Sequence, residues 1–377
     1  MKTSPPDPDR SLPVFINGKF TRQHTTGVQR TAAGLLTALD AELDSMPAHR
    51  RGTWVLLCPP DGVPPALRHI EVRVLGREGG SMLHWEQWLL PRAAAGGLLM
   101  SLAGSAPAFH RRQVCMLHDA AIFDRPEAYT LLFRSWYRML FTWLSYSAHT
   151  LLTVSEYSKI RLCSHLRVRP DRLHVVLNGA DHLAPVEPDD SVFPYYGIEP
   201  RRFILAVASS NPNKNLLRLE AAMRRLHDET GLRLVLVGGI NSRVFARSAA
   251  DDIGDRVVIV RTGPVSDAQL KALYQNAVAL VFPSLYEGFG LPPLEAMSCG
   301  CPVLAAKATA IPEVCGEGAD YFDPHSLADI ERSVRGLVDA PERQTQLRDA
   351  GFGHVRSFRW ADSARRLLEH AHAAARA

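Results

Sequence analysis

One segment holds most of the residues that could do chemistry, and it reads FPSLYEGFGLPPLEAM over residues 282–297. It follows a predicted buried strand and opens a predicted helix. Gly288 and Gly290 free the backbone to approach a ligand closely, and the two prolines that follow suit the first turn of a helix. The N–H groups of Phe289 to Leu291 would then point outward at a helix N-terminus, which favours the binding of a phosphate.

Two carboxylates bracket this turn: Glu287 lies in the loop, and Glu295 follows eight residues later on the helix. Both can reach one pocket, from opposite sides of the predicted phosphate site. Carboxylates accept hydrogen bonds from hydroxyl groups. The pattern therefore fits a ligand with a central diphosphate and hydroxyl-rich groups at both ends, such as a nucleotide sugar. The alternative is a surface helix with two unrelated glutamates, which the ordered run of Gly, Pro and Glu disfavours.

A second polar turn, Ser209 to Asn215, lies between a predicted strand and a predicted helix. Asn213 or Asn215 can cap that helix, which places Lys214 at the helix N-terminus. A cation there is unfavourable to the helix dipole unless an anion lies between them. We therefore expect Lys214 to neutralise a diphosphate, with Ser209 and Asn213 in the same donor site. The alternative is an exposed lysine in a polar turn.

Two weaker motifs lie in the first half of the chain. A turn over residues 25–30, which contains Gly27, predicts a further phosphate or sugar contact. His118 directly follows a predicted strand, at the carboxyl end where open α/β sheets bind ligands. It can hydrogen-bond a sugar hydroxyl or a reacting oxygen, and the alternative is a structural histidine.

Signatures of several other chemistries are absent from the sequence. There is no Walker A sequence, no Gly-x-Ser-x-Gly elbow, and no Gly-x-Gly-x-x-Gly after the first strand, as a nicotinamide-dependent dehydrogenase would need. The six cysteines form no Cys-x-x-Cys pair and are expected to be reduced thiols. The one Asp-x-Asp, at residues 7–9, follows no strand. We expect no metal and no cofactor besides the donor substrate.

The elements that position these residues alternate between short apolar runs and helical patterns. This alternation predicts right-handed crossovers and parallel sheets with helices on both faces, in two doubly wound α/β domains. The predicted strands are Val14–Ile16, Trp54–Leu57, Leu98–Leu102, Val114–Leu117, Thr150–Val154, His174–Leu177, Phe203–Ala208, Leu232–Val237, Val257–Val260, Ala279–Phe282 and Pro302–Ala305. Helices are predicted in the second half over 215–229, 242–253, 266–276 and 291–299, and near the end over 361–375.

The length of 377 residues is typical of two domains. We place them at 1–183 and 184–357, and the Pro-, Asp- and Gly-rich stretch 181–200 is the predicted linker. Residues 1–183 contain 21 Lys and Arg against 15 Asp and Glu, a net charge of +6, whereas the rest of the chain has a net charge of −2. A basic first half can face anionic lipid or a phosphate-bearing substrate, and the alternative is ordinary scatter of charge.

Residues 129–144 have a broad apolar face at helical spacing. This face suits either an interfacial membrane helix or a core helix of the first domain, and we favour the core helix. No run of 18 uncharged apolar residues is present, so no membrane span is predicted.

In type and order, these motifs resemble the GT-B glycosyltransferases of the large retaining group called family 4. The most specific motif is Glu-x7-Glu, from Glu287 to Glu295. The resemblance covers nearly the whole chain, through TGVQR at 26–30, LHDAAIFDRPE at 117–127, TVSEYSK at 153–159, VVLNGAD at 175–181, SNPNKN at 210–215, TGPVSDAQLKALYQNA at 262–277 and GCPVLAAKATAIPEVCGEGADYFDP at 300–324.

This resemblance implies two Rossmann-like domains that face a cleft. The C-terminal domain would bind the nucleotide sugar, the N-terminal domain would bind the acceptor, and a last helix, about 358–377, would pack back on the N-terminal domain. It further implies that Glu295 holds the ribose hydroxyls, that Glu287 contacts sugar hydroxyls near the reacting carbon, and that Lys214 grips the diphosphate with help from the loop amides of Phe289 to Leu291.

In the first domain, the resemblance places Gly27 near the phosphates and His118 near the transferred sugar. Many relatives carry an arginine shortly before the lysine. This chain lacks it, and Arg30 is a candidate substitute.

From the resemblance we expect a retaining, metal-independent hexosyltransferase in which Glu287, His118 and Lys214 are catalytic. GDP-mannose is the favoured donor. A lipid-linked saccharide in cell-surface polysaccharide synthesis, such as lipopolysaccharide, is the favoured acceptor. The expected location is cytoplasmic, with a peripheral position at the inner face of the membrane as the second option, and no nucleic acid partner is expected. The alternatives are a nucleotide-sugar epimerase of the same architecture and a non-catalytic sugar-nucleotide-binding protein.

Overall fold

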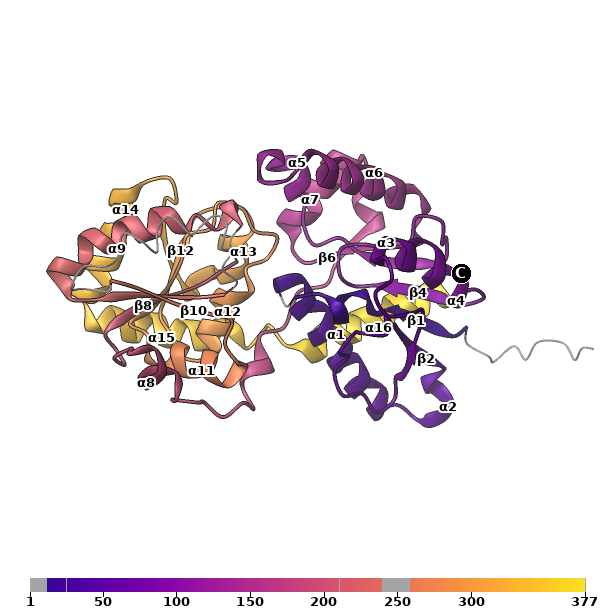
Figure 1. Ribbon diagram of the computed structural model, residues 1–377, viewed down its shortest axis with the longest axis horizontal. Coiled ribbons are helices and arrows are strands. Elements are labelled where there is room, and N and C mark those ends of the chain that lie inside the picture. The colour runs from indigo at the N-terminus through magenta and orange to yellow at the C-terminus, as the bar shows by residue number, and fades with distance from the viewer. Residues whose placement is uncertain (1–11, 25, 210, 239–257, 377) are drawn as a thin grey trace, which may run out of the picture. The chain divides into compact units, whose positions relative to one another are not determined.

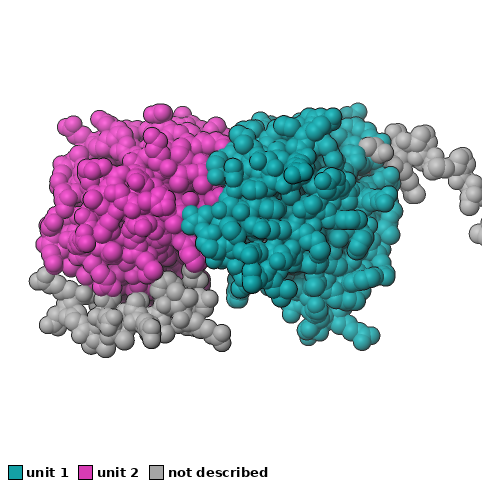
Figure 2. Space-filling model, turned by 90° about the horizontal axis from the view of Figure 1, so that it is seen from above, with its two compact units in different colours: residues 1–179, 359–377 teal, residues 180–358 magenta. Residues whose placement is uncertain are grey.

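The computed structural model describes residues 12–24, 26–209, 211–238 and 258–376. The chain forms two compact units (Figure 2): unit 1 comprises residues 1–179 and 359–377, and unit 2 comprises residues 180–358. The chain therefore passes between the units twice, near the boundaries expected after residues 183 and 357.

Seven parallel strands form the sheet of unit 1, in the order β3-β2-β1-β4-β5-β6-β7. Five of them are buried along their whole length, as expected of strands covered by helices on both faces. The edge strand β3 is exposed throughout. It contains Glu71 and Arg73, and charged side chains on an edge strand disfavour pairing with a strand of another chain. The strands are β1 (Val14–Asn17), β2 (Trp54–Cys58), β3 (Glu71–Val74), β4 (Leu98–Ser101), β5 (Gln113–Met116), β6 (Thr150–Thr153) and β7 (Leu173–Val175).

Helices connect these strands, and the last helix of the chain packs on the first (Figure 1). A Cβ atom on Gly34 would lie 2.7 Å from the ring of Trp360, and one on Gly179 would lie 2.3 Å from the Trp360 backbone nitrogen. Both glycines therefore let the start of α16 approach closely. The helices of unit 1 are α1 (Gly27–Ser45), α2 (Ala48–Arg51), α3 (Met82–His84), α4 (Leu90–Ala93), α5 (Ala121–Asp124), α6 (Leu131–Ser147), α7 (Glu156–Leu166) and α16 (Trp360–Arg376), with a π-helical turn η2 (Trp85–Leu89) and the 3-10 turns η1 (Gly18–Arg22), η3 (Pro126–Ala128) and η4 (Pro170–Arg172).

The helix predicted from the apolar pattern at 129–144 is α6, and only its second half is a core helix. Leu140, Phe141 and Leu144 are buried in a cluster with residues of β5, β6 and α7. Leu131, Leu132 and Phe133 are exposed, and Leu132 is 83% exposed. The preference for a core helix was therefore wrong for the first half of α6. None of the described helices has the length and apolar content needed to cross a bilayer.

Unit 2 contains a six-stranded parallel sheet in the order β10-β9-β8-β11-β12-β13. The short strand β13 was not predicted, and the predicted strand 257–260 begins later, as β10. The strands are β8 (Phe203–Val207), β9 (Arg233–Val237), β10 (Ile259–Gly263), β11 (Ala279–Phe282), β12 (Val303–Ala306) and β13 (Asp320–Phe322). The helix predicted over 242–253 lies outside the described residues.

The helices of unit 2 begin where the sequence indicates. Ser266 and Gln269 form the predicted capping box at the start of α11. The stretch 181–200, expected to be a linker, instead contains two short helices with Val192 and Phe193 buried, and it belongs to unit 2. The helices are η5 (Asp181–Leu183), α8 (Val192–Tyr196), η6 (Pro212–Lys214), α9 (Leu216–Thr230), α11 (Asp267–Asn276), α12 (Leu291–Ser298), α13 (Ile311–Cys315), η7 (Gly316–Gly318), α14 (Leu327–Val338) and α15 (Pro341–Val355).

Candidate functional site

The turn between β11 and α12 presents unused backbone donors. Gly290 occupies the N-cap position of α12 with φ +100°, a conformation that favours glycine. Two prolines follow in the first turn, where missing N–H groups cost little. Within the described chain, the N–H groups of Phe289, Gly290 and Leu291 make no backbone hydrogen bond. Three buried residues at the carboxyl end of β11 therefore present donors at a helix N-terminus.

Lys214 and Glu287 form an ion pair beside this turn. The Lys214 Nζ lies 2.6 Å from Oε1 of Glu287, and it also lies 5.7 Å from the centre of the Phe282 ring. The backbone N–H of Glu287 donates to Oγ1 of Thr309 at 3.0 Å, which fixes the loop that carries the carboxylate. Unit 2 thus brings together a cation, a carboxylate and the end of β11.

The turn that carries Lys214 is held against the same loop. The backbone N–H of Leu285 donates to the carbonyl of Asn213 at 2.7 Å. Asn213 is buried, and its Oδ1 has no hydrogen-bond partner in the described structure. Ser209 lies half-buried just after β8.

The predicted cap of α9 is only half right. Asn215 occupies the N-cap position, but its side chain makes no capping bond. Its Nδ2 instead donates to the carbonyl of Pro283 at 3.1 Å and to that of Pro324 at 2.8 Å. Asn213 belongs to the preceding turn η6, and Lys214 is the last residue of that turn. The Asn215 side chain therefore ties the Lys214 turn to the loop after β11.

Glu295 lies deeper than Glu287 and has its own partners. Its side chain is buried. Tyr274 on α11 donates to Oε2 at 3.0 Å, and Nε2 of His182 lies 3.1 Å from Oε1. Burial and the adjacent Glu295 carboxylate raise the pKa of the Tyr274 phenol well above its usual value, so the hydroxyl stays protonated and donates. Neither oxygen of Glu295 is bonded to Lys214.

Sequence reasoning did not find Tyr274 or His182. Tyr274 follows Leu270 and Leu273 on the buried side of α11, so the pattern indicates only a core aromatic residue. His182 lies in the stretch interpreted as a linker. No spacing in the sequence relates either residue to Glu295.

The two residues predicted from the first domain lie in unit 1. Gly27 is the first residue of α1 and is exposed, and a Cβ atom there would meet nothing within 4 Å. Packing within unit 1 therefore does not require a glycine at this position. His118 follows β5 and is buried.

The proton on His118 is fixed by its surroundings. Nε2 lies 2.8 Å from the carbonyl oxygen of Leu102, which can only accept, so Nε2 carries the hydrogen and Nδ1 is an acceptor. Burial, partly offset by this bond, lowers the pKa of His118 to about 4. The imidazole is therefore neutral at pH 7 and can accept a hydrogen bond from a hydroxyl group.

The described residues contain no group of three or more His, Cys, Asp or Glu side chains placed to hold a metal ion. The six cysteines are free thiols.

Two family descriptions match successive parts of the chain. Residues 55–182 match Glycosyltransferase Family 4, and residues 192–354 match Glycosyl transferases group 1. The first lies largely in unit 1 and the second entirely in unit 2.

Relatives and a solved structure agree with these matches. O-antigen chain mannosyltransferase B of Escherichia coli is 32% identical over 264 residues, which cover 66% of this chain and 67% of that protein. The serotype-specific mannosyltransferase WbdA of Escherichia coli is 35% identical over 175 residues, 45% of this chain, and the match spans only 22% of the length of WbdA. HepE of Anabaena, solved with UDP and glucose, has a TM-score of 0.72 at 16% identity, over 95% of this chain and 99% of that one, which shows the fold.

Proposed function

Because the chain belongs to the group 1 glycosyltransferases of family 4 and has their GT-B fold, we propose that it transfers mannose from a nucleotide diphosphate sugar to a lipid-linked saccharide. The relatives support mannose and a cell-surface polysaccharide such as O-antigen, because they are a serotype-specific mannosyltransferase and an O-antigen chain mannosyltransferase. We propose GDP-mannose as the donor and a saccharide hydroxyl as the acceptor.

One observation carries the proposal: Lys214 and the unused amides of Phe289 to Leu291 both lie at the carboxyl end of β11, where Lys214 and Gly290 each approach the ring of Phe282. When the glycosidic bond to the diphosphate breaks, negative charge develops on the leaving nucleoside diphosphate. A cation and preorganised N–H donors stabilise that charge without reorganising. These groups support a reaction that needs no resident metal, which we propose for this chain.

We propose transfer with retention, as in the group that the sequence resembles. The bond between the anomeric carbon and the diphosphate oxygen breaks, and its electron pair leaves with the nucleoside diphosphate. The acceptor hydroxyl oxygen bonds to the same face of the anomeric carbon. Its proton passes to the departing phosphate oxygen, so atoms and charge balance.

Four side chains have proposed roles in this step. Lys214 neutralises the diphosphate, and Glu287 holds the lysine ammonium while accepting from a sugar hydroxyl. Neutral His118 accepts through Nδ1 from a hydroxyl of the transferred sugar. Glu295 holds the ribose hydroxyls, with its orientation fixed by Tyr274.

A lipid-linked acceptor would bring the enzyme to a bilayer. The first half of α6 exposes Leu131, Leu132 and Phe133, and Arg134 follows directly on the same helix. Exposed apolar residues next to basic ones suit the interface of an anionic membrane. We propose that this half of α6 makes a peripheral membrane contact.

Donor binding tests the proposal directly. Thermal unfolding of the full chain is measured with a panel of nucleotides and nucleotide sugars, for the wild type and for Lys214→Gln. Arg332→Gln on the exposed face of α14 removes the same charge from unit 2 and is the control. A ligand at 100 times its dissociation constant stabilises the folded state by about 2.7 kcal/mol. We expect stabilisation by one nucleotide series, lost only in Lys214→Gln.

The products separate the alternatives. A transferase releases nucleoside diphosphate only when an acceptor is present and lengthens the acceptor by one sugar. An epimerase converts the donor without an acceptor. A non-catalytic protein binds the donor and leaves it intact.

A further inference from the structure

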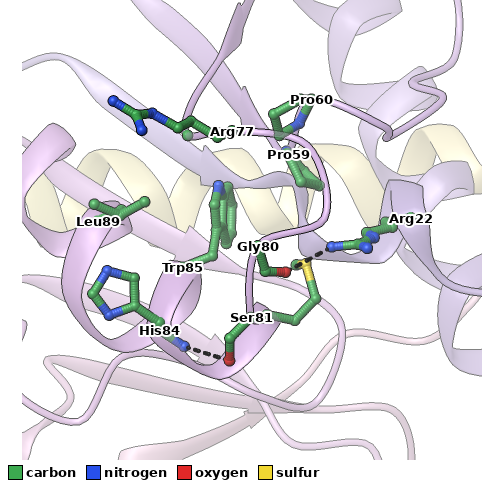
Figure 3. Close-up of a pocket in the computed structure, with 11 residues that line it drawn as sticks. Arg22, Pro59, Pro60, Arg77, Gly80, Ser81, His84, Trp85 and Leu89 are labelled. Carbon is green, nitrogen blue, oxygen red and sulfur yellow. Dashed lines mark hydrogen bonds between the residues drawn. The ribbon is translucent and has the colours of Figure 1, made fainter.

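A cavity of about 390 Å³ opens in unit 1, and none of the candidate site residues predicted from the sequence lines it (Figure 3). Its walls come from segments that follow three neighbouring strands: Arg22 after β1, Pro59 and Pro60 after β2, and Gly76 and Arg77 after β3. The carboxyl edge of a parallel sheet is where open α/β folds bind ligands. The volume is in the range of small-molecule sites.

The floor of the cavity is apolar. The ring of Trp85 is buried, and its Nε1 already donates to the carbonyl of Leu75 at 2.7 Å, so the ring presents only carbon to the cavity. Met82 and Leu89 line the cavity beside it and pack on the same apolar cluster. Gly76 has φ +100°, and a Cβ atom there would lie 3.3 Å from Trp85, so the backbone stays close to the ring.

The charged lining residues are all basic. Arg22 already has partners within the protein. Its Nε lies 2.7 Å from Oδ2 of Asp61, and its Nη1 donates to the carbonyl of Gly80 at 3.0 Å. Arg77 is exposed, and the described structure shows no hydrogen bond or ion pair from its side chain. The imidazole of His84 lines the same cavity. Arg77 is therefore the one arginine of the cavity lining whose side chain has no partner in the described structure.

The same lining argues against a bare sugar as the ligand. Among the described residues that line the cavity there is no Asp, Glu, Asn or Gln. Sugar hydroxyls need such acceptors and donors in large number. An apolar floor with an unpaired arginine in the same lining instead matches a ligand with an anion attached to hydrocarbon, because arginine binds phosphate in bidentate geometry.

We infer that this cavity binds an anionic amphiphile, a phosphate or phosphodiester attached to a hydrocarbon chain. Arg77 would bind the phosphate, and the floor of Met82, Trp85 and Leu89 would bury the first carbons of the chain. In the proposed reaction this ligand is the lipid-phosphate end of the acceptor. That role rests on the proposed function, whereas the binding itself does not need the donor.

Isothermal titration of the full chain with octyl phosphate, below its critical micelle concentration, tests the inference. Inorganic phosphate and octyl glucoside are the two comparison ligands, since each carries half of the proposed chemistry. We expect octyl phosphate to bind at least about tenfold more tightly than either, a difference of about 1.4 kcal/mol. Equal binding of octyl glucoside would show an unspecific apolar pocket, and equal binding of inorganic phosphate would show that the floor is not used. Either result overturns the inference, as does no binding at all.

Variants locate the site. Arg77→Gln and Met82→Gln should each weaken octyl phosphate binding about tenfold. The matched controls are Arg73→Gln, whose pair with Glu71 is exposed, and Leu83→Gln, which is exposed outside the cavity lining. Loss of binding in the controls but not in the cavity variants would place the site elsewhere and overturn the inference. If nucleotide binding fails while octyl phosphate binding follows this pattern, the transferase proposal fails and the cavity site stands.

Discussion

The Nζ atom of Lys214 lies 2.6 Å from Oε1 of Glu287, at the point where the proposed diphosphate would bind. The lysine is thus held in place by a carboxylate before any ligand arrives. A diphosphate must share the ammonium with Glu287, and the carboxylate repels the phosphate. The two residues therefore act in opposite directions on nucleotide binding.

This relationship gives the first prediction. Lys214→Gln should weaken nucleoside diphosphate binding by about tenfold or more, because a hydrogen bond to a charged group contributes about 1.5–3 kcal/mol. Glu287→Gln should leave that binding unchanged or tighter, since it removes a repelling charge, yet lower the transfer rate by about a hundredfold or more. Calorimetry and a transfer assay measure the two effects. Weaker nucleotide binding in Glu287→Gln would contradict the proposed sharing of Lys214.

A second prediction concerns the buried hydroxyl of Tyr274. Tyr274→Phe leaves Oε2 of Glu295 without its donor. A buried group that loses its partner costs about 1–3 kcal/mol, so the free energy of unfolding should fall by that amount. Urea unfolding measures the change. The matched control is Tyr146→Phe, because the side chain of Tyr146 on α6 is exposed. Equal stability of the two variants would show that the bond to Glu295 adds nothing.

The third prediction is a dependence of stability on pH. The pKa of His118 is about 4 in the folded protein, against about 6.5 when unfolded. Between these values the unfolded state binds more protons, so the contribution of His118 is complete above pH 6.5 and disappears as the pH falls towards 4. The difference between the two pKa values corresponds to about 3 kcal/mol in the free energy of unfolding.

Nuclear magnetic resonance titration tests this directly. The His118 imidazole, assigned by comparison with His118→Gln, should stay neutral above pH 5. His118→Gln should also flatten the fall in stability between pH 6.5 and 4. A His118 imidazole that titrates near pH 6.5 would contradict the buried hydrogen bond to Leu102.

Metal removal provides a fourth prediction. If Lys214 and the amides of Phe289 to Leu291 take up the charge of the leaving group, then exhaustive chelation should not change the transfer rate. Addition of magnesium or manganese afterwards should also have no effect. A rate that falls with chelator and recovers with metal would show that an ion shares this charge.

The fifth prediction concerns α6 and membranes. Recovery of the protein with vesicles of anionic lipid should fall as salt is raised, because the Debye length shortens. Replacing exposed Leu132 with Gln should lower the partition coefficient by roughly tenfold, since burying one leucine contributes about 1.5–3 kcal/mol. Leu217→Gln, at an exposed leucine of α9 in unit 2, is the control. Vesicle recovery that does not depend on salt would contradict the proposed contact. So would equal recovery of Leu132→Gln and Leu217→Gln.

Much of the fold could be predicted because buried strands of parallel sheets are plain apolar runs. β11, at Ala279–Phe282, agrees residue for residue with its prediction, and the turn to α12 follows from its Gly and Pro. Strand β3 was missed because Glu71 and Arg73 make an exposed edge look like a loop. The exposed start of α6 was missed because periodicity shows that a helix has an apolar face, and says nothing of what covers it.

The candidate site was predictable where a single stretch of chain builds it. The Gly, Pro and Glu residues around α12 belong to one turn, so their spacing carries the chemistry. The partners of Glu295 come from α11 and from η5, and only tertiary packing brings them together. The partners of Asn215 are backbone carbonyls of Pro283 and Pro324, which no sequence pattern displays.

The docking of Trp360 between Gly34 and Gly179 bears on how the chain folds as it is synthesised. All seven strands of unit 1 leave the ribosome before unit 2 begins, yet the helix that covers α1 emerges only after unit 2. Domains generally fold as units during synthesis. Unit 2 can therefore complete its core first, while the nascent unit 1 keeps an apolar face of α1 uncovered, open to chaperones, until α16 arrives.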